Sequence, residues 1–256
     1  MNIYIDIETL RGSKEHKKQL LEDTKANFKA PSTLTKTQAA KDLGITDSKE
    51  IKFTTAGDMI KRWETELAEE KSELVANEKW EKTSLDPNFA PIACICIGWY
   101  EDETYKTAAF NQSEFTNEAE MLEEFNFTVN NICSRHGAQI HKPFFIGHNI
   151  ARFDLPFIWK RSIINNVKTC AGVKWIGAKH DQHCFDTMIA WAGFCSKISA
   201  DNLCEILNIK GKTNGMCGSL VYDEWQKNPQ KVIDYCADDV TLVKNLHERM
   251  TGVKNG

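Results

Sequence analysis

Residues 1–10 of the chain read MNIYIDIETL. Isoleucines at positions 3, 5 and 7 alternate with Tyr4, Asp6 and Glu8, the period-two pattern of a strand with one buried face. In such a strand Asp6 and Glu8 project from the same side, where two carboxylates can bind a hard cation together. A surface strand can equally carry two acids and no ligand. The stretch therefore predicts a strand, and a metal site only if further acids converge on it.

After this strand, segments whose hydrophobic residues have the period of a strand are interspersed with segments that have the period of a helix. The expected elements are strands at 92–99 and 104–110 that form a hairpin, a helix from Asn117 to Gly137, a strand at 143–147, a helix at 155–164 with Pro156 in its first turn, a strand at 183–186, helices at 187–194 and 200–207, a loop at 211–218, and a last helix that Asn228 caps and Pro229 begins. This order predicts an α/β fold with a sheet of mixed strand direction.

Two further acidic motifs follow the first strand. The segment 148–156 (HNIARFDLP) places Asp154 where an apolar strand turns into a helix. In the segment YCADD, Tyr235 and Asp239 are four residues apart and are neighbours on one face of a helix. Taken singly, Asp154 could merely cap its helix and Asp239 could be an exposed acid. Asp238, three residues from Tyr235, could also share that face.

The three motifs together resemble the DEDD superfamily of exonucleases, in the subgroup with tyrosine in the third motif. The first motif is Asp6-Ile7-Glu8, the second runs from Asn149 to Asp154, and the third is Tyr235 followed by Asp239. The resemblance covers residues 1–10 and 85–250. Nearest in appearance are stand-alone relatives of the proofreading exonuclease domain of family B DNA polymerases, whose pattern the phrase SLDP at 84–87 also resembles. The resemblance implies a ribonuclease H-like mixed sheet flanked by helices.

The resemblance also implies a metal-dependent 3′-to-5′ exonuclease that uses two divalent cations, Mg²⁺ or Mn²⁺. Asp6 would bridge both ions, with Glu8 and Asp239 completing the site on the side of the nucleophile. Asp154 would hold the second ion through water, and Tyr235 would orient the attacking water. Carboxylate oxygens suit these cations, whereas thiolates and imidazoles favour zinc.

Four residues are candidates for contact with the terminal nucleotide: Thr9, Leu10, Asn149 and Phe153. For Leu10 a place in the core, and for Asn149 a place in a turn, are equally good interpretations. Asp186 ends an expected strand, and it either supports the site or caps the next helix.

The expected substrate is the 3′ end of single-stranded DNA, in proofreading-like DNA repair or DNA replication. An RNA exonuclease on the same fold, or a non-catalytic nucleic-acid-binding module, are the alternatives. The net charge of −4, from 32 basic and 36 acidic residues, gives no sign of a general nucleic-acid binder. Residues 1–10 do not resemble a signal peptide, no apolar run could span a membrane, and nine cysteines read as free thiols, so a cytoplasmic protein is expected.

Residues 11–84 do not fit the minimal proofreading pattern. They are rich in Lys and Glu and carry amphipathic stripes, which favours a helical subdomain inserted into a single exonuclease domain spanning residues 1–256. Its lysines are either a clamp over the entering strand or an ordinary solvated face: Lys14, Lys17, Lys18, Lys25 and Lys29. The subdomain could instead bind a protein partner.

A zinc site is a further possibility near His180, His183 and Cys184, with Cys170 and Cys195 close in sequence. The spacing of these residues matches no paired zinc-finger pattern, so zinc is not expected there.

Overall fold

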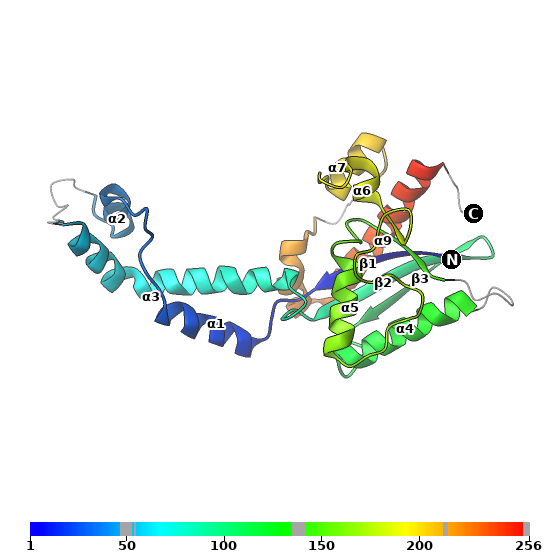
Figure 1. Cartoon of the computed structure of the whole chain (residues 1–256), viewed down its shortest axis with the longest axis horizontal. Helices are drawn as coiled ribbons and strands as arrows, with labels where there is room; N and C mark the ends of the chain where they lie inside the picture. Colours follow the sequence, from blue (N-terminus) through cyan, green and yellow to red (C-terminus); the bar gives the residue numbers. More distant parts are fainter. Residues whose placement is uncertain (47–52, 54, 135–141, 212–214, 253–256) are drawn as a thin grey trace. The chain divides into compact units, whose positions relative to one another are not determined.

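The computed structural model of the chain describes residues 1–46, 53, 55–134, 142–211 and 215–252 (Figure 1). It divides into two compact units. The first unit comprises Met1–Leu10 together with Leu85–Gly256, and the second comprises Arg11–Ser84. In the described part of the chain, every helix is too short or too polar to cross a membrane.

The first unit is built on a mixed sheet, which has five strands within the described residues, in the order β3-β2-β1-β4-β5. β1 lies at the centre, antiparallel to β2 and parallel to β4, and β5 continues the parallel half. The strands are β1 (Asn2–Thr9), β2 (Ile92–Glu101), β3 (Thr104–Asn111), β4 (Phe144–Gly147) and β5 (Cys184–Asp186). The carboxyl ends of β1, β4 and β5 therefore point to the same edge of the sheet.

Helices cover both faces of this sheet, because the residues of β1 alternate between two hydrophobic clusters. Ile3, Ile5 and Ile7 pack with α4 and α5, while Tyr4 on the opposite face packs with α8 and α9. In Figure 1, α4 and α5 lie on one side of the strands and α9 on the other. The helices are α4 (Glu118–Ser134), α5 (Asp154–Ile164), α6 (Thr187–Ala192), α7 (Ala200–Leu207), the 3-10 turn η3 (Gly218–Leu220), α8 (Val221–Lys227) and α9 (Pro229–Thr251). The expected α/β fold with a mixed sheet flanked by helices is confirmed.

Element boundaries differ from expectation in a few places. The helix expected at 187–194 ends at Ala192, because Gly193 takes a positive φ of 77° that a helix cannot continue through. The expected loop at 211–218 gives way to η3 at Gly218, and helix α8 was not anticipated. The expected extension of α4 to Gly137, and residues 212–214 of the expected loop, lie outside the described residues.

The second unit is helical and has its own small core. It contains α1 (Lys14–Ala26), α2 (Lys36–Asp42) and α3 (Ala56–Lys82), followed by the 3-10 turn η2 (Thr83–Leu85). Thr55 and Asp58 form a capping box that begins α3. Phe28 stacks on Trp63 with ring centroids 5.8 Å apart, and the Trp80 indole donates a 2.7 Å hydrogen bond to the carbonyl of Gly12.

Candidate active site

Three carboxylates converge between the central strand and the last long helix. Carboxylate oxygens of Asp6 and Glu8 on β1, and of Asp239 on α9, all lie within 4.8 Å of one another. Asp6 and Glu8 share a face because they are two residues apart on a strand, and α9 packs on that face. These oxygens form a cluster of hard donors of the kind that Mg²⁺ and Mn²⁺ prefer.

The helical phase of α9 separates Asp239 from its neighbour. The residues of α9 that are buried against the sheet recur at helical spacing, and Asp239 belongs to this buried stripe, whereas Asp238 is exposed. Of these two acids, Asp239 is therefore the one that the structure places beside Asp6 and Glu8.

Asp154 is the first residue of α5 and is only 4% exposed. Burial raises the pKa of its carboxyl to about 7, and the charges of Asp186 and Asp239 act in the same direction. Hydrogen bonds from the backbone N–H groups of Asp154 itself and of Ile7 oppose this change. Because Ile7 lies between Asp6 and Glu8, the Asp154 carboxyl lies beside the strand that carries them.

Asp186 is fully buried at the end of β5 and accepts four backbone hydrogen bonds. The N–H groups of Met188 and Ile189 donate to Oδ1 at 3.0 and 3.2 Å, so Asp186 caps α6. The N–H groups of Asn149 and Ala151 donate to its two carboxylate oxygens at 3.1 and 3.2 Å. The expected cap of the next helix is therefore confirmed, and the same carboxylate fixes the turn that leads to Asp154.

Tyr235 lies one turn before Asp239 on the same buried face of α9. Its side chain is 4% exposed and belongs to the hydrophobic cluster that includes Tyr4 and Ile146. The expected sharing of one helical face by Tyr235 and Asp239 is found in the structure.

The four residues expected to contact the terminal nucleotide lie in two segments. Thr9 and Leu10 follow a register shift at the end of β1, and both are buried. Leu10 packs in the hydrophobic cluster that α9 covers. Its N–H donates a 2.9 Å hydrogen bond to the carbonyl of Pro91. Asn149 and Phe153 follow β4 and are half-buried. Asn149 has a positive φ of 61°, which the asparagine side chain tolerates better than most.

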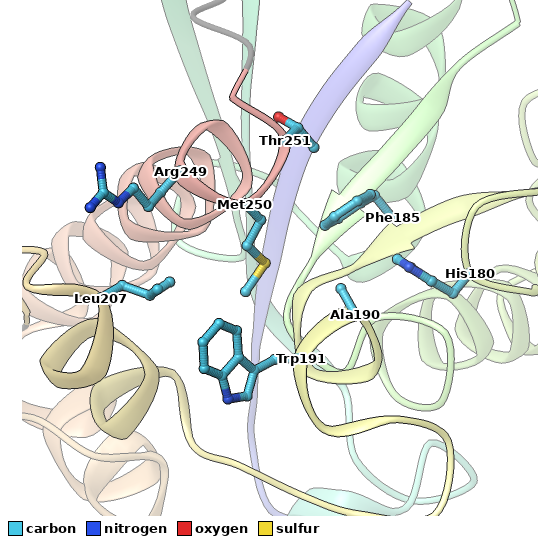
Figure 2. A pocket seen from close by; sticks show the side chains of 8 residues that line it. All are labelled: His180, Phe185, Ala190, Trp191, Leu207, Arg249, Met250 and Thr251. Atoms are coloured by element: carbon cyan, nitrogen blue, oxygen red, sulfur yellow. The ribbon is translucent and has the colours of Figure 1, made fainter.

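A pocket of about 350 Å³ lies elsewhere on this unit (Figure 2). Its lining residues are His180, Phe185, Ala190, Trp191, Leu207, Arg249, Met250 and Thr251. Arg249 is ten residues beyond Asp239, which is about 15 Å along a helix axis. The pocket is therefore separate from the carboxylate cluster.

Three cysteines form a second cluster, which the sequence did not predict. The Sγ atoms of Cys94, Cys96 and Cys236 lie within 4.8 Å of one another. Burial raises the pKa of the Cys236 thiol, and hydrogen bonds with Cys236 and Cys94 lower the pKa of Cys96 to about 5. The available signals were the spacing of Cys94 and Cys96 on an expected strand and the place of Cys236 directly after Tyr235.

The zinc ligands considered at His180, His183 and Cys184 are engaged in local contacts. His180 Nδ1 accepts from the N–H of Asp186 at 3.1 Å, and His183 Nδ1 accepts from the N–H of Lys179 at 3.2 Å. In the described ranges, the metal-ligating groups that converge are the carboxylate and cysteine clusters, and these residues belong to neither.

The lysines of the second unit also have structural contacts. Lys25 forms ion pairs with Glu69 and Glu73 at 3.4 and 3.1 Å, and Lys17 Nζ lies 4.2 Å from the centroid of the Trp80 ring. These two lysines therefore hold α1 against α3, whatever else they contact.

Comparison with known proteins places the chain in a family. Among curated proteins none matches it. Residues 85–253, about two thirds of the chain, match the family model described as a predicted 3′-5′ exonuclease related to the exonuclease domain of PolB. The matched range contains Asp154, Tyr235 and Asp239, and the fold adds β1 with Asp6 and Glu8 to the centre of the same sheet. The chain therefore has a ribonuclease H-like fold and belongs to this family of predicted 3′-5′ exonucleases.

Proposed function

We propose that the protein hydrolyses phosphodiester bonds at the 3′ ends of single-stranded DNA, with two divalent cations held by Asp6, Glu8, Asp154 and Asp239. The observation that carries the proposal is the convergence of the Asp6, Glu8 and Asp239 oxygens within 4.8 Å in a chain of this family. Carboxylates that close together repel one another, so a group of them in a folded protein is best explained by a positive partner.

The donor set fits Mg²⁺ or Mn²⁺ because all four side chains offer hard oxygens. The raised pKa of Asp154 fits as well, since that buried carboxyl stands beside other acids and would be stabilised in its charged form by a cation. When bound, a pair of such ions would lower the pKa of a water molecule and stabilise the 3′ oxygen that leaves phosphorus and stays on the shortened strand.

The roles proposed for the four acids are those that the resemblance to the exonuclease family implies. Asp6, on the central strand, would contact both ions. Glu8 and Asp239 would complete the position on the side of the nucleophile. Asp154, at the start of α5, would hold the second ion through water.

Tyr235 is proposed to orient the attacking water. The position of Tyr235 supports this role, because the residue lies one turn before Asp239 on the buried face of α9, where packing against the sheet fixes the ring. A hydroxyl held in this way can accept or donate a hydrogen bond without first losing rotational freedom.

The terminal nucleotide is proposed to contact Thr9, Leu10, Asn149 and Phe153. These residues end β1 or follow β4, and the carboxyl ends of these parallel strands share one edge of the sheet. Ligands bind at such edges in α/β proteins. Phe153 and Asn149 are the more exposed pair and offer an aromatic ring and an amide for stacking and hydrogen bonding to a base.

The test is a digestion series with the full chain and 3′- or 5′-labelled oligonucleotides, with and without Mg²⁺ or Mn²⁺. We expect single-stranded DNA to shorten from its 3′ end, release mononucleotides and stop when the metal is chelated. Undiminished cleavage in excess EDTA, or cleavage of a circular strand, would contradict the mechanism. Faster digestion of RNA than of DNA would favour an RNA exonuclease built on the same site.

A further inference from the structure

Three buried thiols meet on the face of the sheet that α9 covers. Cys94 and Cys96 are two residues apart on β2 and share that face, while Cys236 reaches it from α9. All three side chains are at most 2% exposed, and their Sγ atoms lie within 4.8 Å of one another. The arrangement thus brings three sulfur donors to one point from a strand and a helix far apart in sequence.

This cysteine cluster directly adjoins the carboxylate cluster. In the register of β1 and β2, Asp6 stands opposite Cys96 and Glu8 stands opposite Cys94. The Cys236 thiol lies 3.3 Å from the backbone carbonyl oxygen of Asp6 and 3.5 Å from its carboxylate Oδ2. Asp6 therefore offers the cysteine cluster an oxygen donor as well.

We propose that Cys94, Cys96 and Cys236 form a binding site for a zinc ion, with the Asp6 carboxylate as the fourth donor. Zinc takes four ligands in a tetrahedral arrangement and accepts both thiolate and carboxylate. Three sulfurs at about 2.3 Å from one ion lie about 4 Å apart, so the observed limit of 4.8 Å leaves movements of about 1 Å or less. On binding, the thiols release their protons to solvent and coordinate as thiolates.

The two clusters favour different ions, and Asp6 is the one residue that both would use. Thiolates select zinc or copper(I), and the oxygen of Asp6 in the fourth position favours zinc of these two. Mg²⁺ and Mn²⁺ prefer oxygen and do not compete for three thiolates. The competing explanation is that the cysteines are small apolar residues filling the core, as buried cysteines elsewhere in the chain do, among them Cys133 and Cys204.

The experiment uses the full chain with the exposed Cys195 and Cys217 changed to serine, so that surface thiols do not contribute. This background variant is reduced, stripped with a chelator, transferred to excess Mg²⁺ and titrated with Zn²⁺, with bound metal measured after dialysis. Titration with Cd²⁺ in parallel reports metal–thiolate bonds by their ultraviolet charge-transfer band. We expect one zinc per chain, the cadmium band, and a higher melting temperature with zinc.

Adding Cys96→Ala or Cys236→Ala to the background should weaken zinc binding at least about tenfold and reduce the cadmium band. Cys133→Ala, which removes a buried thiol elsewhere, should leave both unchanged. Two variants are used so that one remains informative if the other does not fold by circular dichroism. The proposal is overturned if the background variant binds no zinc in excess Mg²⁺, or if the folded variants bind zinc as tightly as the background.

The zinc site and the proposed nuclease activity are tested separately. Asp239→Asn removes a carboxylate that is not among the four proposed zinc ligands, and it should leave zinc binding and the cadmium band intact. Asp6→Asn should weaken zinc binding while keeping the cadmium band. A protein that binds zinc in this way but digests no nucleic acid would refute the proposed function alone.

Discussion

The carboxylate cluster and the cysteine cluster are adjacent on one face of the sheet, yet they differ in how they tolerate the absence of a ligand. Asp6, Glu8 and Asp239 bring three carboxylates together, whereas the other cluster consists of thiols, of which only Cys96 has a lowered pKa. Packing alone can explain three small buried thiols in a core, but it does not explain three converging acids.

The difference shows that a cluster of possible metal ligands is stronger evidence for an ion when its groups destabilise the folded state without one. The converging acids favour a bound cation, because carboxylates held this close together repel one another. The thiols become evidence through a second observation, the Asp6 oxygen 3.5 Å from Cys236, which gives a sulfur cluster a fourth donor. The two sites are therefore expected to respond to different ions and, apart from the shared Asp6, to different substitutions.

The largest expected effect is that of replacing Asp239 in the carboxylate cluster. Asp239→Asn should lower exonuclease turnover by about 10²- to 10³-fold, because one charge-stabilising group is lost where the reaction develops charge. Asp238→Asn is the matched control, since it changes the adjacent exposed acid and should retain turnover within about twofold. Initial rates on labelled single-stranded DNA at saturating Mg²⁺ measure both. Equal losses in the two variants would mean that the carboxylate cluster is not the reaction site.

Tyr235→Phe tests a neutral group beside the charged ones. The change removes a hydroxyl and keeps the buried ring, so the fold and DNA binding should be retained while kcat falls by about 10²-fold. Single-turnover rates and a binding titration in Ca²⁺ separate the two quantities. If affinity falls as much as the rate, Tyr235 acts in binding instead of in orienting water.

Sequence patterns predicted most of the first unit because its signals are local. The alternation of Ile3, Ile5 and Ile7 and the pairing of Asn228 with Pro229 mark where elements begin and which faces are buried. Helix α8 was missed because only Val221 and Trp225 are buried in it, too few residues to show a period.

The candidate site was predictable through its motifs, but its contacts were not. The sequence alone could not choose between Asp238 and Asp239, since both are close to Tyr235 on a helical wheel, and packing against the sheet decides the matter. Asp186 needed the structure for the same reason, because its two roles depend on the turn at Asn149 folding back onto it. The cysteine cluster depends on the contact between β2 and α9, which no local pattern encodes.

Melting temperatures should distinguish the carboxylate cluster from the cysteine cluster by their response to Mn²⁺. Mn²⁺ at a hundredfold excess over its Kd should stabilise the wild-type protein by about 2.7 kcal/mol, because only the folded state binds the ion. Asp239→Asn should gain much less, and Cys96→Ala should gain as much as wild type. Melting curves with and without Mn²⁺ in the three proteins measure this. A Mn²⁺ response that disappears with Cys96→Ala would show that the two clusters act as one site.

The smallest expected effect is the pH dependence of stability in the metal-free protein. The pKa of Asp154 is about 7 in the folded state, against an ordinary value of 3.8. Between about pH 4 and pH 7 its carboxyl therefore keeps a proton in the folded state that it has lost in the unfolded state. The contribution of Asp154 to the free energy of unfolding is therefore fully present below about pH 4. It falls as the pH rises toward 7, by roughly 2 kcal/mol between pH 5 and 7. Asp154→Asn removes this titration and should flatten the curve, while keeping the buried side chain's size. Urea unfolding in EDTA at several pH values measures the slopes. If wild type and Asp154→Asn lose stability equally between pH 5 and 7, Asp154 is already charged in the metal-free protein and the repulsion inferred for the carboxylate cluster does not extend to it.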